Sequence, residues 1–513
     1  MPPRVLMLGW EFPPFITGGL GTACFGLTKA LDRLGVETTF VLPKSTPIED
    51  GSHVKVISPG ESARKLMLRK RAKNDASVSE PSASVERKPV SPPSGPPSTQ
   101  SAPHELETLK SIETELHRIL IPNDNGVYPS LEPAMVEVMK ESSHEIQRIR
   151  TMVDMGILEA GKEETAMALF SALPEAGPPK ELDEEETIDE RPSSSADYSG
   201  DLIGQAEHYA RFCSMISKNI DFDVIHAHDW LTYPAGLAVS RISGKPLVVH
   251  VHSTEFDRSG EHVNQVVYNI ERRGMHGASK VIAVSHLTRE IVENRYGIEH
   301  DKVNVVWNGI DVEPAKGPSA HIRKNDKIVL YFGRITHQKG PEYFIAAAKR
   351  VLDLDPNVKF VVAGSGDLAE RMIRMAAELG IGHKVLFTGF LRGSDIERIF
   401  SIADLYVMPS VSEPFGIAPL EAMSHDVPVL ISRRSGVSEV LMHALKVDFW
   451  DIDDMANKVL AVLRHSPLSK ALRDGGRFEL RRITWDGAAE KCEQIYNDMT
   501  SHGLGPARAG NRM

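Results

Sequence analysis

The sequence predicts an α/β protein made of two doubly wound, Rossmann-like domains that face a central cleft. Two successive series of short apolar segments, each alternating with helical patterning, predict this fold. The first series covers residues 1–59 and 201–311, and the second covers residues 312–484. Ligands of such sheets bind beyond the carboxyl ends of the strands, so the cleft between the domains is the expected site.

The first domain opens with a strand, a helix and a second strand. "RVLMLG" has the composition of a buried strand, "LGTACFGLTKALDRLG" is helical up to Gly35, and "ETTFVLP" is the next strand. The same rhythm resumes after residue 201 with a helix over "GQAEHYARFCSMISK". Four candidate parallel strands follow: "DVIHAH", "PLVVHVH", "KVIAVS" and "KVNVVW".

Residues 60–200 are predicted to be an insertion in the first domain, partly disordered and partly helical. Residues 60–103 and 172–199 are dominated by polar residues and proline, and too few apolar groups are present to offset the loss of chain entropy. Helical patterning lies between them, in "ELETLKSIETELHRIL" and "PAMVEVMKESSHEIQRIRTMVDM".

The second domain is predicted to contain five strands: "KIVLYFG", "VKFVVAG", "KVLFTG", "DLYVMPS" and "VPVLIS". A closing helix is expected over residues 485–502, from "WDGAAEKCEQIYNDM", and residues 503–513 are expected to form a flexible tail.

Composition narrows the class of protein. The formal net charge is -11, with Asp+Glu 70 and Lys+Arg 59, which argues against a nucleic-acid partner and against stable association with anionic membranes. The three cysteines, Cys24, Cys213 and Cys492, lack metal-ligand spacing. The apolar runs are shorter than a membrane span. We therefore expect a cytoplasmic protein, and the sequence does not indicate its oligomeric state.

Two cations follow the first strand of the second domain. "YFGRITHQKG" places Arg334 and Lys339 in the loop at the end of that strand. In a negatively charged chain such a local cluster could hold a diphosphate, with arginine giving a forked contact and lysine a point charge. The alternative is a pair of solvated loop cations.

Two glutamates lie eight positions apart in "SVSEPFGIAPLEAM". A helix is expected to begin near Gly416 or Ile417, so Glu413 precedes it and Glu421 lies inside it. Helix N-termini favour phosphate, and carboxylates beside one suggest a ligand that also carries hydroxyls, such as a sugar nucleotide. Alternatively, Glu421 is a solvated helix residue and Glu413 a turn residue.

Other groups leave alternatives open. Gly18 and Gly19, after the first strand, allow either a sharp turn or a close approach to a ligand. Histidines two apart on a strand share one face, so His226 with His228, or His250 with His252, could bind zinc in a metal-dependent hydrolase. "DID" at residues 451–453 could be a metal-diphosphate motif, although helix capping by Asp453 is the preferred interpretation.

Taken together, these motifs resemble the retaining glycosyltransferases of the GT-B fold, especially family 4 and more distantly the bacterial glycogen synthases. The segments that carry the resemblance are "GWEFPPFITGGLG", "DVIHAHDW", "VVHVHST", "FGRITHQKG" and "EPFGIAPLE". The chain departs from bacterial glycogen synthases at Ile16, where those enzymes carry lysine. Family 4 is therefore the closer match, and the donor nucleotide stays open.

The resemblance implies a role for each matching residue. It assigns Arg334, Lys339, Glu413 and His252 to catalysis, and Gly18, Gly19, Glu421, Gly416, Ile417, Gly364 and Gly366 to donor binding. The two cations would hold the donor diphosphate, Glu421 the ribose hydroxyls, and Glu413 and His252 the transferring sugar. No metal ion or other cofactor is expected.

The expected activity is transfer of glucose from UDP- or ADP-glucose to an α-glucan. The same fold could instead transfer a hexose to a cell-surface polysaccharide, a glycolipid or a small glucoside, and a third hypothesis is a non-catalytic regulatory protein that binds sugar nucleotides. The first-domain helices carry no basic stripe, which favours a water-soluble acceptor. Aromatic residues that could stack on its sugar rings are Trp10, Phe12, Phe15, Trp230 and Tyr233.

Overall fold

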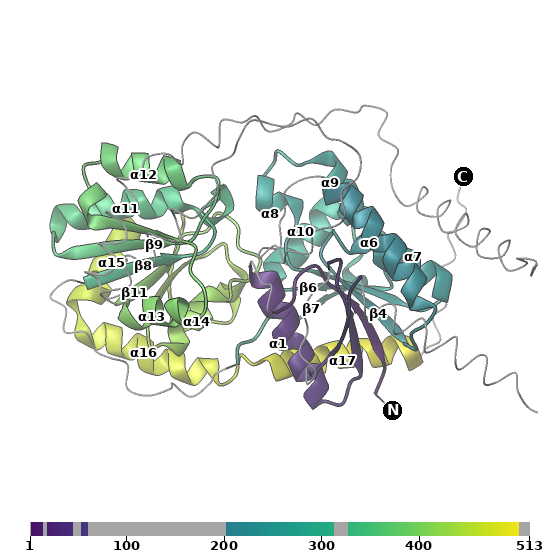
Figure 1. Cartoon of the computed structure of the whole chain (residues 1–513). Coiled ribbons are helices and arrows are strands. Elements are labelled where there is room, and N and C mark those ends of the chain that lie inside the picture. Colours follow the sequence, from purple (N-terminus) through teal and green to yellow (C-terminus); the bar gives the residue numbers. More distant parts are fainter. Residues whose placement is uncertain (1, 14–17, 45–52, 60–201, 312–326, 502–513) are drawn as a thin grey trace, which may run out of the picture.

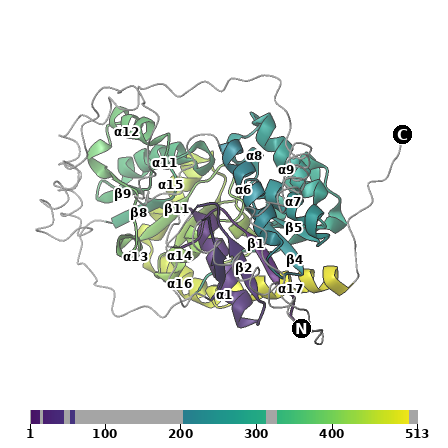
Figure 2. The same ribbon diagram turned by 45° about the vertical axis from the view of Figure 1, so that its right-hand side comes forward.

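The computed structural model describes residues 2–13, 18–44, 53–59, 202–311 and 327–501, and the account below concerns these residues. It contains two parallel β-sheets, each covered by helices on both faces (Figures 1 and 2). The predicted fold class is confirmed. The predicted insertion at 60–200, the tail at 503–513, Phe15 and Ile16 lie outside the described residues.

The first sheet has seven strands in the order β3-β2-β1-β4-β5-β6-β7, all paired in parallel. Its strands are β1 (Val5–Leu8), β2 (Thr38–Val41), β3 (Lys55–Ile57), β4 (Val224–His228), β5 (Leu247–Val251), β6 (Lys280–Ala283) and β7 (Val303–Val305). The accompanying helices are α1 (Gly19–Arg33), α6 (Leu202–Ser217), α7 (Tyr233–Ser243), α8 (Glu255–Ser259), α9 (Gln265–Gly277), α10 (His286–Tyr296) and the 3-10 turn η3 (His300–Lys302).

The second sheet has six parallel strands in the order β10-β9-β8-β11-β12-β13. They are β8 (Lys327–Phe332), β9 (Val358–Ala363), β10 (Val385–Gly389), β11 (Leu405–Met408), β12 (Val429–Ser432) and β13 (Leu445–Val447). Its α-helices are α11 (Pro341–Leu354), α12 (Ala369–Glu378), α13 (Ser394–Ile402), α14 (Ala418–Ser424), α15 (Ile452–Arg464) and α16 (Ser466–Leu480). Its 3-10 turns are η4 (His337–Lys339), η5 (Gly382–Lys384) and η6 (Gly436–Glu439).

Residues of the central strands are buried on both faces, as parallel sheets require. Along β1, Leu6 and Leu8 pack into a core beneath α6 and α7. Val5 and Met7 face the opposite side, where they pack into a second core. This alternation follows from the two-residue period of a strand, and it explains why an uninterrupted apolar run predicted these strands.

The last helix returns to the first sheet. α17 (Trp485–Ser501) packs beside α1 in the core that holds Val5 and Met7, and both views show it beneath that sheet (Figures 1 and 2). Trp485 is 4% exposed. A Cβ atom added to Gly26 of α1 would lie 2.3 Å from the indole Cε2. Glycine at 26 therefore lets the indole lie directly against the backbone of α1.

Three local features differ from the sequence expectations. The edge strands β3 and β13 were not predicted, because three residues give too short a pattern to detect. The expectation that Asp453 caps a helix is wrong. Asp451 is the N-cap of α15, with its side chain accepting a hydrogen bond from Asp454 N at 2.9 Å, whereas Asp453 pairs with Arg350 at 3.2 Å.

No helix among the described residues combines the length and the apolar character needed to cross a lipid bilayer.

Replacing Trp485 with alanine should lower the free energy of unfolding of the first domain, which contains the first sheet, by about 3–5 kcal/mol. This is the usual cost of truncating a buried large aromatic residue. Trp450, which is 54% exposed, provides a matched control, and Trp450→Ala should change this free energy by less than about 0.5 kcal/mol. Urea denaturation followed by circular dichroism measures both. Equal stabilities of the two variants would contradict the packing described for α17.

Candidate active site

Loops at the carboxyl ends of the two sheets meet at one junction. α8, which follows β5 of the first sheet, packs against η4, which follows β8 of the second. Lys339 lies in η4, and His252 lies between β5 and α8. The structure thus brings together two segments that the sequence assigned to a shared site.

Lys339 and Glu413 form an ion pair, with the partly exposed Lys339 Nζ 2.5 Å from the buried Glu413 Oε2. Glu413 is 6% exposed, and the hydroxyl of Ser410 donates a second hydrogen bond to the same oxygen at 3.1 Å. The backbone of Glu413 is bonded to that of Arg434 and Gly436, which fixes the turn against the loop after β12. A carboxylate this deeply buried needs such partners to stay charged.

Arg334 is exposed in the loop after β8. Its backbone carbonyl accepts a hydrogen bond from Tyr331 Oη at 2.7 Å, which fixes the main chain at this position. The guanidinium makes no ion pair with any residue in the described ranges, so its charge is available to an anion, while that of Lys339 is already opposed by Glu413.

Glycines let the loops after β8 and β9 lie against each other. Gly364, with a φ of 144°, is so close to Gly333 that an added Cβ would lie 1.9 Å from the carbonyl oxygen of Gly333. A Cβ on Gly366 would lie 2.3 Å from the carbonyl oxygen of Ile335. These glycines thus hold the Arg334 loop in place through main-chain contact, and the structure explains them without a ligand.

The turn before α14 also depends on glycine. Gly416 has a φ of 97°, and Ile417 is the N-cap of α14, close to the start predicted from the sequence. Glu421 lies in the first turn of this helix, and burial raises the pKa of its carboxyl group to about 7. Its carboxylate forms no hydrogen bond with other residues of the described part of the chain.

Gly18 and Gly19 lie at the N-terminus of α1, Gly18 as N-cap and Gly19 as the first helical residue. A Cβ added to either would meet no described atom within 4 Å. Their φ angles do not require glycine: Gly18 has a φ of -164°, which any residue adopts. A turn requirement therefore does not explain these glycines.

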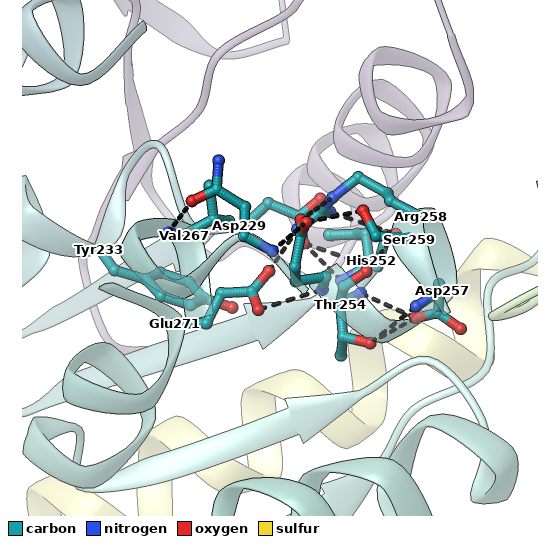
Figure 3. A network of polar contacts seen from close by, with 12 residues as sticks. Asp229, Tyr233, His252, Thr254, Asp257, Arg258, Ser259, Val267 and Glu271 are labelled. Atoms are coloured by element: carbon teal, nitrogen blue, oxygen red, sulfur yellow. Dashed lines mark hydrogen bonds and ion pairs between the residues drawn. The ribbon is translucent and has the colours of Figure 1, made fainter. Parts of the chain in front are cut away.

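Asp229 fixes the segment around His252 (Figure 3). Its Oδ1 accepts hydrogen bonds from the backbone N–H of His252 at 2.7 Å and of Ser253 at 3.3 Å. Asp229 holds a φ of 58°, a conformation that aspartate tolerates better than most residues. Burial raises the pKa of its carboxyl group to about 7. The sequence analysis missed this residue, although it follows the second histidine of "HAHDW" directly.

A cluster of hydrogen-bonded side chains around Arg258 supports the same segment (Figure 3). Arg258 donates to Glu255 at 3.1 Å and to Glu271 at 2.5 Å, and Tyr296 donates to the other oxygen of Glu271. Burial raises the pKa of Glu271. The sequence gave no signal for this cluster, because its members come from three separate helices.

Four histidines stack on the face of the first sheet that α17 covers. The rings of His226 and His228 lie 4.3 Å apart, and those of His250 and His252 lie 4.2 Å apart. The hydroxyl of Tyr496, from α17, lies 2.6 Å from His226 Nδ1. Burial lowers the pKa of His226 and of His252 to about 3, so both are neutral near pH 7.

The zinc alternative requires ring nitrogens that converge on one point. His226, His228 and His250 have ring nitrogens within 4.8 Å of one another. However, the planes of His226 and His228 are inclined by only 25°, and two stacked rings share no in-plane point about 2 Å from a nitrogen of each. This geometry favours a packed imidazole cluster.

Most of the described aromatic residues that the sequence suggested for stacking on acceptor sugars are not on the surface. Trp10, Phe12 and Tyr233 are buried in the core, with Trp10 edge-on to Tyr209 and the hydroxyl of Tyr233 near the carbonyl oxygen of His250 at 3.2 Å. Trp230 is partly exposed. Among the described aromatic residues named from the sequence, only Trp230 thus keeps a partly open position.

Comparisons with known proteins identify the family of the chain. Residues 4–78 match a starch synthase catalytic domain, residues 174–314 match Glycosyltransferase Family 4, and residues 314–478 match glycosyl transferases group 1. An uncharacterized glycosyltransferase of Methanocaldococcus jannaschii is 32% identical over 294 residues, covering 54% of this chain and 75% of that protein. The chain belongs to the family 4 glycosyltransferases.

Two further relatives of this glycosyltransferase have assigned activities. Alpha-maltose-1-phosphate synthase of Mycolicibacterium smegmatis is 36% identical over 320 residues, covering 56% of this chain and 82% of the relative. Glycogen synthase of Mycobacterium tuberculosis strain H37Rv is 26% identical over 282 residues, covering 53% and 68%.

Solved structures support the GT-B fold. Sucrose-phosphate synthase from Thermosynechococcus elongatus superposes with a TM-score of 0.60 at 15% identity, covering 97% of this chain and 100% of that one. Anabaena HepE in complex with UDP-glucose gives a TM-score of 0.51 at 21% identity, covering 58% and 84%. The strands predicted from the sequence thus correspond to a known two-sheet architecture.

The histidine cluster should make stability depend on pH. A histidine held neutral in the fold but free to protonate when unfolded, near pH 6.5, costs about 1.4 kcal/mol of stability for each pH unit below 6.5, down to its folded pKa. Stability should therefore fall between pH 6.5 and about 3. In His226→Gln the change of unfolding free energy with pH should be smaller by the contribution of one histidine, about 1.4 kcal/mol per pH unit. The exposed His383 is the control, and His383→Gln should keep the wild-type pH dependence.

Urea titrations at half-unit pH steps measure these slopes, and His226→Gln is compared with the wild type at each pH. An unchanged slope in His226→Gln would show that this imidazole is not excluded from protonation in the folded protein.

Proposed function

We propose that this glycosyltransferase moves glucose from UDP- or ADP-glucose to an α-glucan, with retention of the anomeric configuration. The observation that carries the proposal is the Lys339–Glu413 ion pair, which lies at the junction of the two sheets and near the exposed Arg334 in the sequence. The names of similar proteins support both substrates: a relative named glycogen synthase supports the α-glucan acceptor, and a solved neighbour described in complex with UDP-glucose supports the donor.

Each group has a defined part in the proposed mechanism. Arg334 and Lys339 stabilise the charge that develops on the diphosphate as it leaves, and this electrostatic contribution replaces a strong base. Glu413 holds Lys339 in place and meets the hydroxyls of the transferring sugar. Glu421 accepts hydrogen bonds from the ribose hydroxyls, because its carboxylate forms no hydrogen bond with other described residues.

The first half closes the site in this proposal. The backbone at Gly18 and Gly19 approaches the donor phosphates, and neutral His252 lines the sugar pocket, as an imidazole of low pKa can hydrogen bond without adding charge. Trp230 is the aromatic residue retained as a contact for the acceptor. The reaction uses no metal ion, because the two cations supply the positive charge. The three free thiols, all buried, suit a cytoplasmic enzyme.

A second acceptor is favoured by a specific observation. The relative with 36% identity is named alpha-maltose-1-phosphate synthase, which indicates a small phosphorylated sugar as an alternative to the glucan. The third hypothesis, a regulatory protein without turnover, keeps donor binding and predicts no transfer to any acceptor.

One experiment separates these functions. The purified chain is incubated with radiolabelled UDP-glucose or ADP-glucose and, in turn, glycogen, maltooligosaccharides, glucose 1-phosphate or lipid vesicles, each with and without EDTA. We expect transfer to glycogen and maltooligosaccharides that EDTA does not reduce, and a product that an α-1,4-specific amylase digests. Transfer to glucose 1-phosphate alone selects the second acceptor. Transfer to lipid alone, or an amylase-resistant polymer, contradicts the glucan proposal.

Arg334→Ala and Lys339→Ala should each lower kcat by roughly two to three orders of magnitude, the effect of losing one preorganised group that stabilises a developing anion. Their stabilities should differ. Arg334 is exposed without an ionic partner among the described residues, whereas Lys339→Ala leaves Glu413 buried without its cation, which costs about 3–5 kcal/mol.

Arg350→Ala is the matched control, since this arginine pairs with Asp453 on an exposed surface, and it should keep wild-type turnover. Initial rates and thermal unfolding are measured for all three variants. Turnover within a few-fold of the wild type in a folded Arg334→Ala protein would remove that residue from the mechanism.

A further inference from the structure

A side-chain hydrogen bond joins the His252 segment (residues 252–257) to the Glu413 turn (residues 411–413). Ser412 Oγ donates to Asp257 Oδ1 at 2.5 Å, although 155 positions separate the two residues in the chain. Asp257 is 3% exposed, and Ser412 is partly buried. The bond therefore crosses between the two halves in a place that is largely shielded from water.

The other oxygen of Asp257 holds the first half. Asp257 Oδ2 accepts hydrogen bonds from Thr254 N at 2.8 Å and from Thr254 Oγ1 at 2.7 Å, as part of a capping box at the start of α8 (Figure 3). Thr254 lies two residues after His252, whose own backbone is fixed by Asp229. The carboxylate of Asp257 is thus rigidly connected to the His252 segment.

Ser412 is equally well connected to the second half. It directly precedes Glu413, which pairs with Lys339. The carbonyl oxygen of Gln338 accepts hydrogen bonds from Val411 N at 2.9 Å and Ser412 N at 3.5 Å, and Gln338 is the neighbour of Lys339 in η4. The Ser412 hydroxyl therefore moves with the Lys339–Glu413 pair as one unit.

The mechanism proposed above assigns no role to this bond. Neither Asp257 nor Ser412 was assigned a role by sequence, and the carboxylate of Asp257 is occupied by three hydrogen bonds, so it is not an acid or a base for the reaction. Both residues nevertheless adjoin groups that the proposed mechanism requires on opposite sides of the junction.

We propose that Asp257 and Ser412 are positioning residues that set the His252 segment against the Lys339–Glu413 pair when the two halves close on the donor. This inference rests on the proposed function for the identity of the reaction. Because the bond joins the two halves, its free energy contributes to the arrangement in which they are in contact. A hydrogen bond to a charged, buried carboxylate is stronger than one between neutral groups, which suits it to this role.

The role has a kinetic consequence. In the proposed site, the nucleotide is held mainly by Arg334 and Glu421, which both belong to the second half. Loss of the Asp257–Ser412 bond should therefore leave nucleotide binding intact and impair the transfer step, because a loosened junction misplaces His252 and admits water. Loss of the bond should thus lower turnover and leave the affinity for the nucleotide unchanged.

The decisive variant is Ser412→Ala, which removes the bond and leaves the Asp257–Thr254 capping box in place. We expect kcat to fall about tenfold, the affinity for UDP measured by calorimetry to stay within twofold, and the ratio of donor hydrolysis to transfer to rise. Ser412→Thr keeps a hydroxyl and should recover most of the lost turnover. Ser438→Ala is the matched control, since the Ser438 hydroxyl donates only to Arg433 within the second half, at 3.2 Å.

A double-mutant cycle tests whether the two residues act together. Asp257→Asn keeps an oxygen for the cap but weakens the bond to Ser412, and combining it with Ser412→Ala should cost little more than the larger single effect. Fully additive losses would show that the residues act independently and would overturn the proposal.

Hydrogen–deuterium exchange tests the contact without any sugar substrate. In Ser412→Ala, amides in residues 252–257 and 411–413 should exchange faster than in the wild type, while those of β9 and α15 should not change. Unchanged exchange together with unchanged kcat overturns the proposal. If the wild-type chain transfers no glucose, the proposed function fails, and the exchange measurement still decides whether this bond holds the two halves together.

Discussion

The parallel arrangement of both sheets is the constraint from which the site follows. In a parallel sheet every strand ends at the same edge, so the loops after the strands gather there. The two sheets meet at these edges, where α8 of one half packs against η4 of the other. Residues from distant parts of the chain, such as His252, Lys339 and Glu413, therefore reach one junction.

Charge is distributed unevenly at this junction. The chain carries a formal net charge of -11, and the buried carboxylate of Glu413 is neutralised by Lys339. Arg334 remains as a cation without an ionic partner in the described part of the chain, on a loop that closely packed glycines hold still. The junction thus carries a positive charge that no described residue opposes, in a protein whose net charge is negative.

The sequence predicted what depends on local pattern. Central strands such as Leu247–Val251 are buried on both faces, so they form continuous apolar runs, and the ends of these runs also predicted where the following loops begin. The Asp257–Ser412 bond could not be predicted, because no local pattern relates residues so far apart. Trp10 and Tyr233 could either stack on a sugar ring or pack in the hydrophobic core, since each combines a large apolar ring with a polar atom. Only their tertiary packing shows which of the two roles they have.

The return of α17 to the first sheet affects how the chain is made. The core that holds Val5 and Met7 also contains Trp485 and Tyr496, so this face of the first sheet is only partly covered, by α1, until α17 has been synthesised. The second sheet, in contrast, has its own helices up to α16. On the ribosome, the half that emerges second can therefore complete its core first, and the earlier half must wait with an exposed apolar face that chaperones can bind.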